Sequence, residues 1–185
     1  MNHTVTSKEA ILDAGVHIAA ERGIEALNIR DVAKRCGISV GCVYRYFPSK
    51  AALLTATVGT VWETIFHEAH GAAPGEGFRE CVARVYECAR CGSEDYPSFF
   101  AMHPAGFTSN EKSEGHAAMT RYLDHIRSGM LAALNDDREV RPDAFDKSFT
   151  REGLVAFIFD NILSFAAAER PDCGYLIRLL DRLIY

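Results

Sequence analysis

The sequence of 185 residues lacks several features that would place it in common functional classes. No run approaches the roughly 18 consecutive apolar residues that a membrane-spanning helix requires, and Met1-Asn2-His3-Thr4 does not start a signal peptide. No alternating Val-, Ile- or Thr-rich run predicts a convincing strand. No nucleophile elbow or phosphate-binding glycine loop is present. These absences predict an all-α, cytoplasmic protein that is not an enzyme.

The chain also lacks the net positive charge that is typical of nucleic-acid-binding proteins. Its formal net charge is -5, but residues 1–50 carry 7 Lys and Arg against 5 Asp and Glu, whereas residues 51–185 carry 13 against 20. Any contact with a polyanion is therefore expected in the first fifty residues. The six cysteines are expected to be free thiols, because the cytoplasm is reducing.

Three short helices are predicted in the basic part of the chain. Thr6 and Glu9 have the spacing of a capping box for a first helix that stops at Gly23. Asn28 is the predicted cap of a second helix, which stops at Gly37. Ser39 then caps a third helix that runs through Phe47, because Pro48 forbids its continuation.

The remaining chain also has apolar residues at helical spacing. Ser49 is predicted to begin a long helix that reaches about His70 and leads out of the basic part. Further helices are expected at about 77–91, 96–103, 113–135, 143–168 and 172–184, with a loop at about 104–112. The predicted organisation is a helix-turn-helix domain at residues 1–50 and a helical ligand-binding and dimerisation domain at residues 51–185.

The turn Gly37-Ile38 separates two short helices in the manner of a helix-turn-helix motif. In the second of these helices, Val43 and Phe47 stand four residues apart and are expected to face the core. The opposite side carries Gly41, Cys42, Arg45 and Tyr46. A lone domain gains little by exposing a tyrosine beside an arginine, so this side is predicted to contact DNA.

Three cations stand in the first turns of predicted helices, namely Lys8, Arg30 and Lys50. A cation there opposes the helix dipole by about 0.3 to 1 kcal/mol. A phosphate resting on the backbone amides of the same turn would convert this cost into binding energy. These residues are therefore predicted to bind phosphates.

The stretch "AILDAGVHIAAERGIEALNIRDVAKRCGISVGCVYRYFPSKAALL", residues 10–54, resembles the DNA-binding head of the tetracycline-repressor (TetR) family of bacterial transcription regulators. The shared features are Glu21-Arg22-Gly23, Ile29 to Ala33, Gly37-Ile38-Ser39, Tyr44 to Phe47, and Ser49-Lys50. The remainder matches only in length and helix layout. Two residues depart from the family pattern: Cys42 replaces the frequent Thr or Ser, and Ala19 replaces the Phe that usually packs inside the head.

The resemblance implies a homodimer that inserts two recognition helices into successive major grooves of a near-palindromic operator. It places Val40, Gly41, Cys42 and Arg45 at base edges, and Tyr44, Tyr46, Lys50 and Asn28 mainly at phosphates. Of these, Arg45 has the bidentate group that favours guanine. The expected function is that of a repressor released from DNA by a small molecule, although the sequence does not separate a repressor from an activator.

The C-terminal part is expected to supply a dimer interface and a ligand pocket. Residues 149–168 are apolar on nearly every side, and the resemblance puts the last two helices into a four-helix interface between protomers. Aromatic residues with a few polar groups predict an apolar pocket. Its candidate residues are Trp62, Phe66, Tyr86, Phe99, Phe100, Tyr122, His125, Phe157 and Asn161, with Arg121 and Asp160 as further polar candidates.

Several alternatives remain open from the sequence. Cys81, Cys88 and Cys91 share one helix face and would suit a thiol-based sensor. His67 and His70 could join Cys88 and Cys91 in a metal sensor, but no second motif-spaced pair occurs, and neither a metal nor another cofactor is predicted. A protein-recruiting factor on the same fold, or a Cys-His enzyme assembled in space, are further possibilities.

Overall fold

The computed structural model describes residues 7–69, 76–96, 99 and 112–185. Every regular element within these ranges is a helix, which confirms the all-α prediction. The predicted helix at 96–103 and the loop after it fall mostly outside the described residues, as does His70. The chain forms two compact units, residues 1–64 with 95–122 and residues 65–94 with 123–185.

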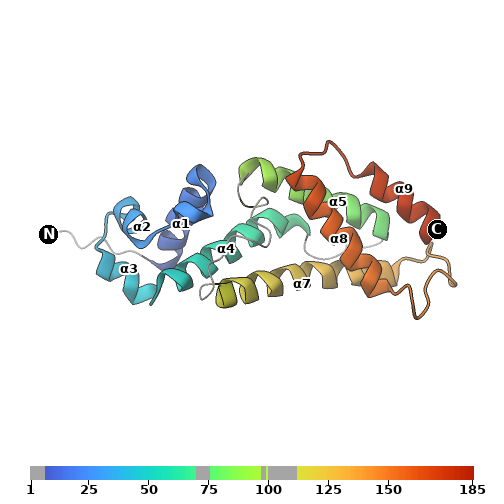
Figure 1. Cartoon of the computed structure of the whole chain (residues 1–185), viewed down its shortest axis with the longest axis horizontal. Coiled ribbons are helices and arrows are strands. Elements are labelled where there is room, and N and C mark those ends of the chain that lie inside the picture. Colours follow the sequence, from blue (N-terminus) through green and yellow to red (C-terminus); the bar gives the residue numbers. More distant parts are fainter. Residues whose placement is uncertain (1–6, 70–75, 97–98, 100–111) are drawn as a thin grey trace. The chain divides into compact units, whose positions relative to one another are not determined.

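The first unit contains the three N-terminal helices and most of the helix that follows them (Figure 1). Its elements are α1 (Lys8–Arg22), the 3-10 turn η1 (Ile24–Ala26), α2 (Ile29–Cys36), α3 (Val40–Tyr46) and α4 (Lys50–Phe66) as far as Thr64. Its core is made of side chains with no exposed surface, among them Ile11, Leu27, Val32, Val43 and Leu53. Burial of these side chains supplies the main stabilising term of the unit.

The cap of α1 differs from the prediction by one residue. Ser7, and not Thr6, precedes the helix, and its Oγ accepts a hydrogen bond from the Ala10 amide at 3.1 Å. Thr6 lies outside the described residues. Both Ser and Thr cap helices, with Ser somewhat preferred, and Ser7 takes the extended backbone of a cap residue.

The second unit contains the C-terminal helices (Figure 1). Its elements are the end of α4, the 3-10 turn η2 (His67–Ala69), α5 (Phe78–Asp95), α7 (Lys112–Asp136) from Leu123, α8 (Arg151–Ala167) and α9 (Gly174–Leu183). The rings of Phe66 and Phe159 lie 6.3 Å apart in its core. Gly92 lets α5 approach α4 closely, because a Cβ at this position would lie 2.6 Å from Cγ2 of Ile65.

The predicted helix at 143–168 begins later than expected, at Arg151. The carboxylate of Asp146 accepts hydrogen bonds from the amides of Ser148 and Phe149 at 2.7 and 2.8 Å, which holds a turn before the helix. Thr150 then caps α8 by accepting from the Gly153 amide at 3.0 Å. Side-chain bonds of this kind compete with helical ones, so residues 143–150 were wrongly assigned to the helix.

The two compact units divide the chain inside α4 and α7. The predicted division into residues 1–50 and 51–185 separates regions by function and not by packing. It therefore stays a prediction.

Candidate nucleic-acid interface

The helix α3 is fixed at both ends by its own sequence. Gly37 precedes it with a left-handed backbone (φ 66°), which a residue with a Cβ adopts at a cost. Ser39 caps it, and its Oγ accepts from the Cys42 amide at 3.2 Å. At the other end the Phe47 amide donates to the Val43 carbonyl at 2.9 Å. A helix of only seven residues is thereby held in one place.

The two sides of α3 differ as the sequence predicts. Val43 and Phe47 are buried in the first unit. The large apolar side chains on the other side remain exposed, to 38% for Val40, 47% for Tyr44 and 39% for Tyr46. Arg45 and Gly41 are also exposed, and Cys42 is half-buried. The outer side of α3 therefore combines apolar surface, aromatic rings and a guanidinium.

The three first-turn cations are exposed at the starts of three helices. Lys8 is the first residue of α1, Arg30 the second of α2, and Lys50 the first of α4. The Lys8 ammonium also lies 5.7 Å from the centre of the Phe47 ring. Since Phe47 closes α3, this contact ties the start of α1 to the end of α3.

Two other arginines of the first unit are bound to carboxylates. Arg35 makes two hydrogen bonds to Glu21, at 2.8 and 2.9 Å, and Arg22 lies 3.0 Å from Asp31. The hydrogen bond from Arg35 lowers the pKa of Glu21, and those from Asn28 and then Arg22 lower the pKa of Asp31. These pairs join α2 to α1 and remove two of the five acidic charges from the surface that faces outward.

The other five cations of residues 1–50 have no carboxylate partner among the ion pairs of the described residues. They are Lys8, Arg30, Lys34, Arg45 and Lys50. Sequence reasoning missed Lys34, because it searched only the first turns of helices. The signal was present, since Lys34 stands four residues after Arg30 and shares its helix face. Each ion pair removes one cation and one carboxylate, so residues 1–50 keep their net charge of +2 (7 minus 5), now carried by five outward cations and three other carboxylates.

Asn28, predicted to contact phosphate, is engaged within the protein. Its Oδ1 accepts from the Asp31 amide at 2.9 Å, while its Nδ2 donates to the Ala26 carbonyl and to the Asp31 carboxylate. An amide nitrogen has two hydrogens, and both are used. The side chain therefore caps α2 and retains no donor for a phosphate.

The residues predicted to line a ligand pocket are divided between the two units. Trp62, Phe99 and Tyr122 belong to the first unit, whereas Phe66, Tyr86, His125, Phe157 and Asn161 belong to the second. Phe100 lies outside the described residues. The structure brings Trp62 and Phe99 together, with ring centres 5.1 Å apart.

Several of the predicted pocket residues have other partners. The hydroxyl of Tyr86 donates to the Arg170 carbonyl, and the Asn161 amide donates to the Phe157 carbonyl of its own helix. Phe157 is 52% exposed, which is unusual for a pocket wall. Asp160 pairs with Arg127 at 2.9 Å. His125 and Arg121 are exposed on α7.

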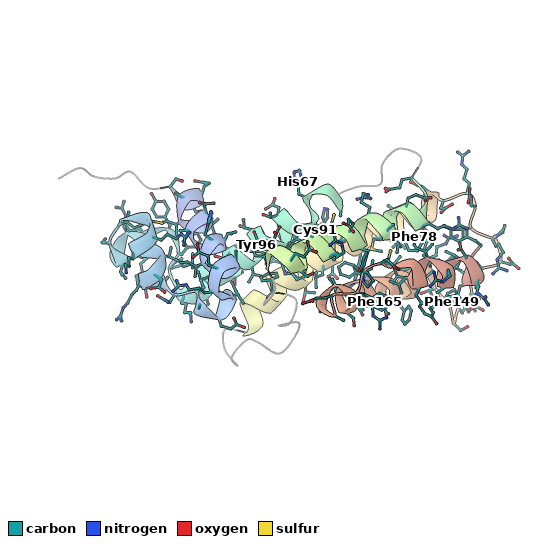
Figure 2. All side chains as sticks on the ribbon, turned by 90° about the horizontal axis from the view of Figure 1, so that it is seen from above. His67, Phe78, Cys91, Tyr96, Phe149 and Phe165 are labelled. Carbon is teal, nitrogen blue, oxygen red and sulfur yellow. The ribbon has the colours of Figure 1, made fainter. Side chains whose placement is uncertain are left out.

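The chemistry of the cysteines does not favour a thiol sensor. Burial raises the pKa of Cys81 to about 11, and the pKa of Cys91 is also raised, chiefly by desolvation. Cys91 is exposed on α5 (Figure 2), but its thiol donates to the Glu87 carboxylate at 3.6 Å. A raised pKa leaves less of the reactive thiolate at neutral pH.

Within the described ranges, no group of three or more His, Cys, Asp or Glu side chains could hold a metal ion. No helix in the same part of the chain is long and apolar enough to cross a bilayer.

Comparison with known proteins assigns the N-terminal region. Residues 11–57 match the model of the family described as bacterial regulatory proteins, tetR family. The HTH-type transcriptional repressor KstR of Mycolicibacterium smegmatis is 43% identical over 70 residues, which cover 38% of this chain and 34% of KstR. The match thus spans about a third of the length of that relative.

Solved structures share the fold of this chain over nearly its whole length. Salmonella enterica GusR has a TM-score of 0.72 at 17% identity, with 100% of this chain and 98% of GusR covered. BioQ, solved with its natural double-stranded DNA operator, has a TM-score of 0.63 at 17% identity, with 96% and 97% covered. At these identities the likeness shows a shared fold.

Proposed function

We propose that the chain is a transcription regulator of the TetR family and that it binds double-stranded DNA as a homodimer, since residues 11–57 match the model of that family of bacterial regulatory proteins. One observation carries the proposal: α3 exposes Val40, Tyr44 and Tyr46 beside Arg45, while five cations of the same unit lack carboxylate partners among the described residues. Double-stranded DNA fits this combination, because its phosphates attract the cations and its grooves expose base edges to the side chains of α3. The family is regulatory, so no enzymatic activity is proposed.

The outer side of α3 reads base edges in the major groove. The Arg45 guanidinium can bind O6 and N7 of guanine, and such a bidentate pair provides about 1 to 3 kcal/mol of discrimination. Val40 suits the methyl group of thymine, and Gly41 lets the backbone approach the groove. Cys42 is half-buried and contributes little beyond a small contact.

The phosphates on either side of the groove are bound by cations and tyrosines. Lys8, Arg30 and Lys50 stand where backbone amides at helix starts also attract anions. Tyr44 and Tyr46 add hydroxyl donors. Lys34 joins this set, and Asn28 leaves it for a positioning role, since its amide holds the start of α2.

The homodimer forms through α8 and α9. Outside α3, the exposed large apolar side chains of the described residues are Phe157 on α8 and Tyr175 and Leu183 on α9. Exposed apolar groups on neighbouring elements are typical of a protein interface. A symmetric pairing of these helices covers them and sets two α3 helices at the spacing of successive major grooves.

A small molecule releases the dimer from its near-palindromic operator, which makes the protein a repressor. The effector binds the region after residue 50, and the head at residues 1–50 moves with α4. Because coupling is reciprocal, the effector must bind the DNA-free form more tightly than the DNA-bound form. The protein meets both the effector and the operator DNA in the cytoplasm.

The proposal is tested by selection of genomic DNA fragments with the purified full-length protein, followed by anisotropy titrations of the recovered sequence. Enrichment of one near-palindromic site, bound at least about a thousandfold more tightly than scrambled DNA at physiological salt, is the expected outcome. Equal binding of all fragments, or none at low salt, would reject it.

A further inference from the structure

An aromatic cluster lies in the same compact unit as the DNA-reading helices. Trp62, on the second half of α4, contacts Phe99 with ring centres 5.1 Å apart and a tilt of 60°. Tyr96, which follows α5 (Figure 2), lies 6.4 Å from Phe99 with a tilt of 58°. Trp62 and Phe99 are buried, but Tyr96 is only half-buried, so the cluster reaches the surface at one end.

The same unit also holds Glu63, which follows Trp62 on α4, and a fourth ring, that of Tyr122. Tyr122 of α7 lies against Gly59, where a Cβ would be 3.6 Å from its ring. Glu63 is one turn further along the same helix face and is exposed. Burial and then the Glu63 carboxylate raise the pKa of the Tyr122 hydroxyl, which places the two groups close together. Glu63 takes part in none of the ion pairs of the described residues.

The faces of aromatic rings attract cations, and an adjacent carboxylate adds to that attraction. The carboxylate repels an anion that approaches the same surface. The four rings come from three segments of the chain. Together with the exposed carboxylate, they favour a ligand that is both positively charged and apolar. Plain core packing explains Trp62 and Phe99, but it does not explain an exposed carboxylate beside a half-buried tyrosine.

We propose that Glu63, Tyr122, Tyr96 and the edge of the Trp62–Phe99 pair form a binding site for an aromatic or quaternary organic cation. The carboxylate binds the charge, and the rings bind the apolar groups around it. This proposal names the effector class for the proposed function and rests on that function for its regulatory meaning. Because the cluster and α1 to α3 share one unit, occupancy acts directly on α4 behind the head.

The site has a built-in reporter, because Trp62 is the single tryptophan of the chain. The full-length protein is titrated with tetraphenylphosphonium while the tryptophan fluorescence is recorded. Tetraphenylborate, which has the same shape and the opposite charge, is the control ligand. Saturable quenching by the cation, at least about tenfold tighter than by the anion, is expected. Equal affinities for the two ions, or no saturable change with either, would overturn the site.

Two variants separate the carboxylate from the rest of the surface. Glu63→Gln keeps the shape and should weaken cation binding about fivefold to tenfold, while anion binding should become tighter because the repelling charge is gone. Glu152→Gln, which neutralises an exposed carboxylate on α8, should have no effect. Equal losses in both variants would mean that overall charge, and not this site, attracts the cation.

DNA binding is measured in the same samples. Loss of operator affinity on adding the cation, absent in Glu63→Gln, supports the regulatory role. Cation binding with unchanged operator affinity keeps the site but removes that role. A protein that binds the cation and no DNA refutes the proposed function and leaves the site intact, so the two failures are distinguishable.

Discussion

The two units differ in how they use their arginines and lysines. In the second unit, Arg79, Arg84, Arg90 and Arg127 each pair with one or two carboxylates. Among residues 1–50, Arg22 and Arg35 do so, while five cations on α1 to α4 take part in none of the ion pairs of the described residues. Carboxylates outnumber cations by 20 to 13 in residues 51–185, whereas seven cations stand against five carboxylates in residues 1–50, so an outside anion meets less repulsion at the first fifty residues.

The exposed apolar residues of the two units also differ in the charges that surround them. Those of α3 alternate with positive charge that can meet a polyanion. Those of α8 and α9 lie near charged groups that have contacts within the same chain, since the Arg178 guanidinium lies 6.0 Å from the centre of the Tyr175 ring and Asp181 pairs with Arg79. A second copy of the same surface can cover these apolar side chains. The exposed apolar residues of α3 therefore predict DNA as the partner, whereas those of α8 and α9 predict a second copy of the chain.

The largest expected effect comes from placing charge on the second surface. Phe157→Glu should weaken the dimer by about 2 to 4 kcal/mol, because the variant removes an aromatic side chain from the interface and buries a carboxylate there. Sedimentation velocity should then show monomers at micromolar concentration, and operator affinity should fall in parallel. Lys147→Glu, an exposed position before α8, is the control and should remain dimeric. A dimeric Phe157→Glu protein would move the interface elsewhere.

A substitution on α3 should change the preference among DNA sequences more than the overall affinity for DNA. Arg45→Ala is expected to lose about 1 to 3 kcal/mol of preference at one base pair of each half-site. Binding to operators substituted at single positions, measured by anisotropy, locates that base pair. If the variant retains the full sequence preference, Arg45 does not read a base.

Changes among the outward cations should alter the salt dependence instead. Lys50→Ala should weaken binding to all sequences, and the slope of log affinity against log salt should become shallower by about 0.9 for each phosphate that a head no longer binds. Arg35→Gln, which removes a cation already bound to Glu21, is the matched control and should leave the slope unchanged. Identical slopes in the wild type and Lys50→Ala would take that lysine off the phosphate surface.

The smallest effect is expected from a residue that touches neither surface. Thr57 is completely buried on α4, and its hydroxyl has no hydrogen-bond partner among the described residues. Thr57→Val should therefore raise the free energy of unfolding by about 1 kcal/mol. Thr60→Val is the control, because Thr60 already donates to the Ala56 carbonyl at 3.1 Å, and it should be neutral or slightly destabilising. Urea denaturation compares the two.

The sequence predicted the first unit well, because its helix ends are encoded by single residues. Asn28, Gly37 and Ser39 cap or stop helices as expected. It failed where a side chain chose between local partners, because Asp146 holds a turn where the apolar periodicity suggested helix. The sequence also did not show that both amide hydrogens of Asn28 are used within the protein.

Contacts between residues far apart in the chain could not be predicted from the sequence either. The ion pair of Glu21 and Arg35 joins positions 14 residues apart, and only the folded helices bring them together. That pairing shows that Arg35 is not among the cations available to an outside anion. The aromatic residues were recognised, but periodicity does not tell which rings meet, as Trp62 and Phe99 do.

The central claim is that two copies of α3 meet one DNA duplex. Hydroxyl-radical footprinting of the full-length protein on its selected site tests it most directly. The account predicts two protected patches on one face of the duplex, about one helical turn apart, that both disappear with Phe157→Glu. A single patch, or two patches that persist when the protein is monomeric, would contradict it.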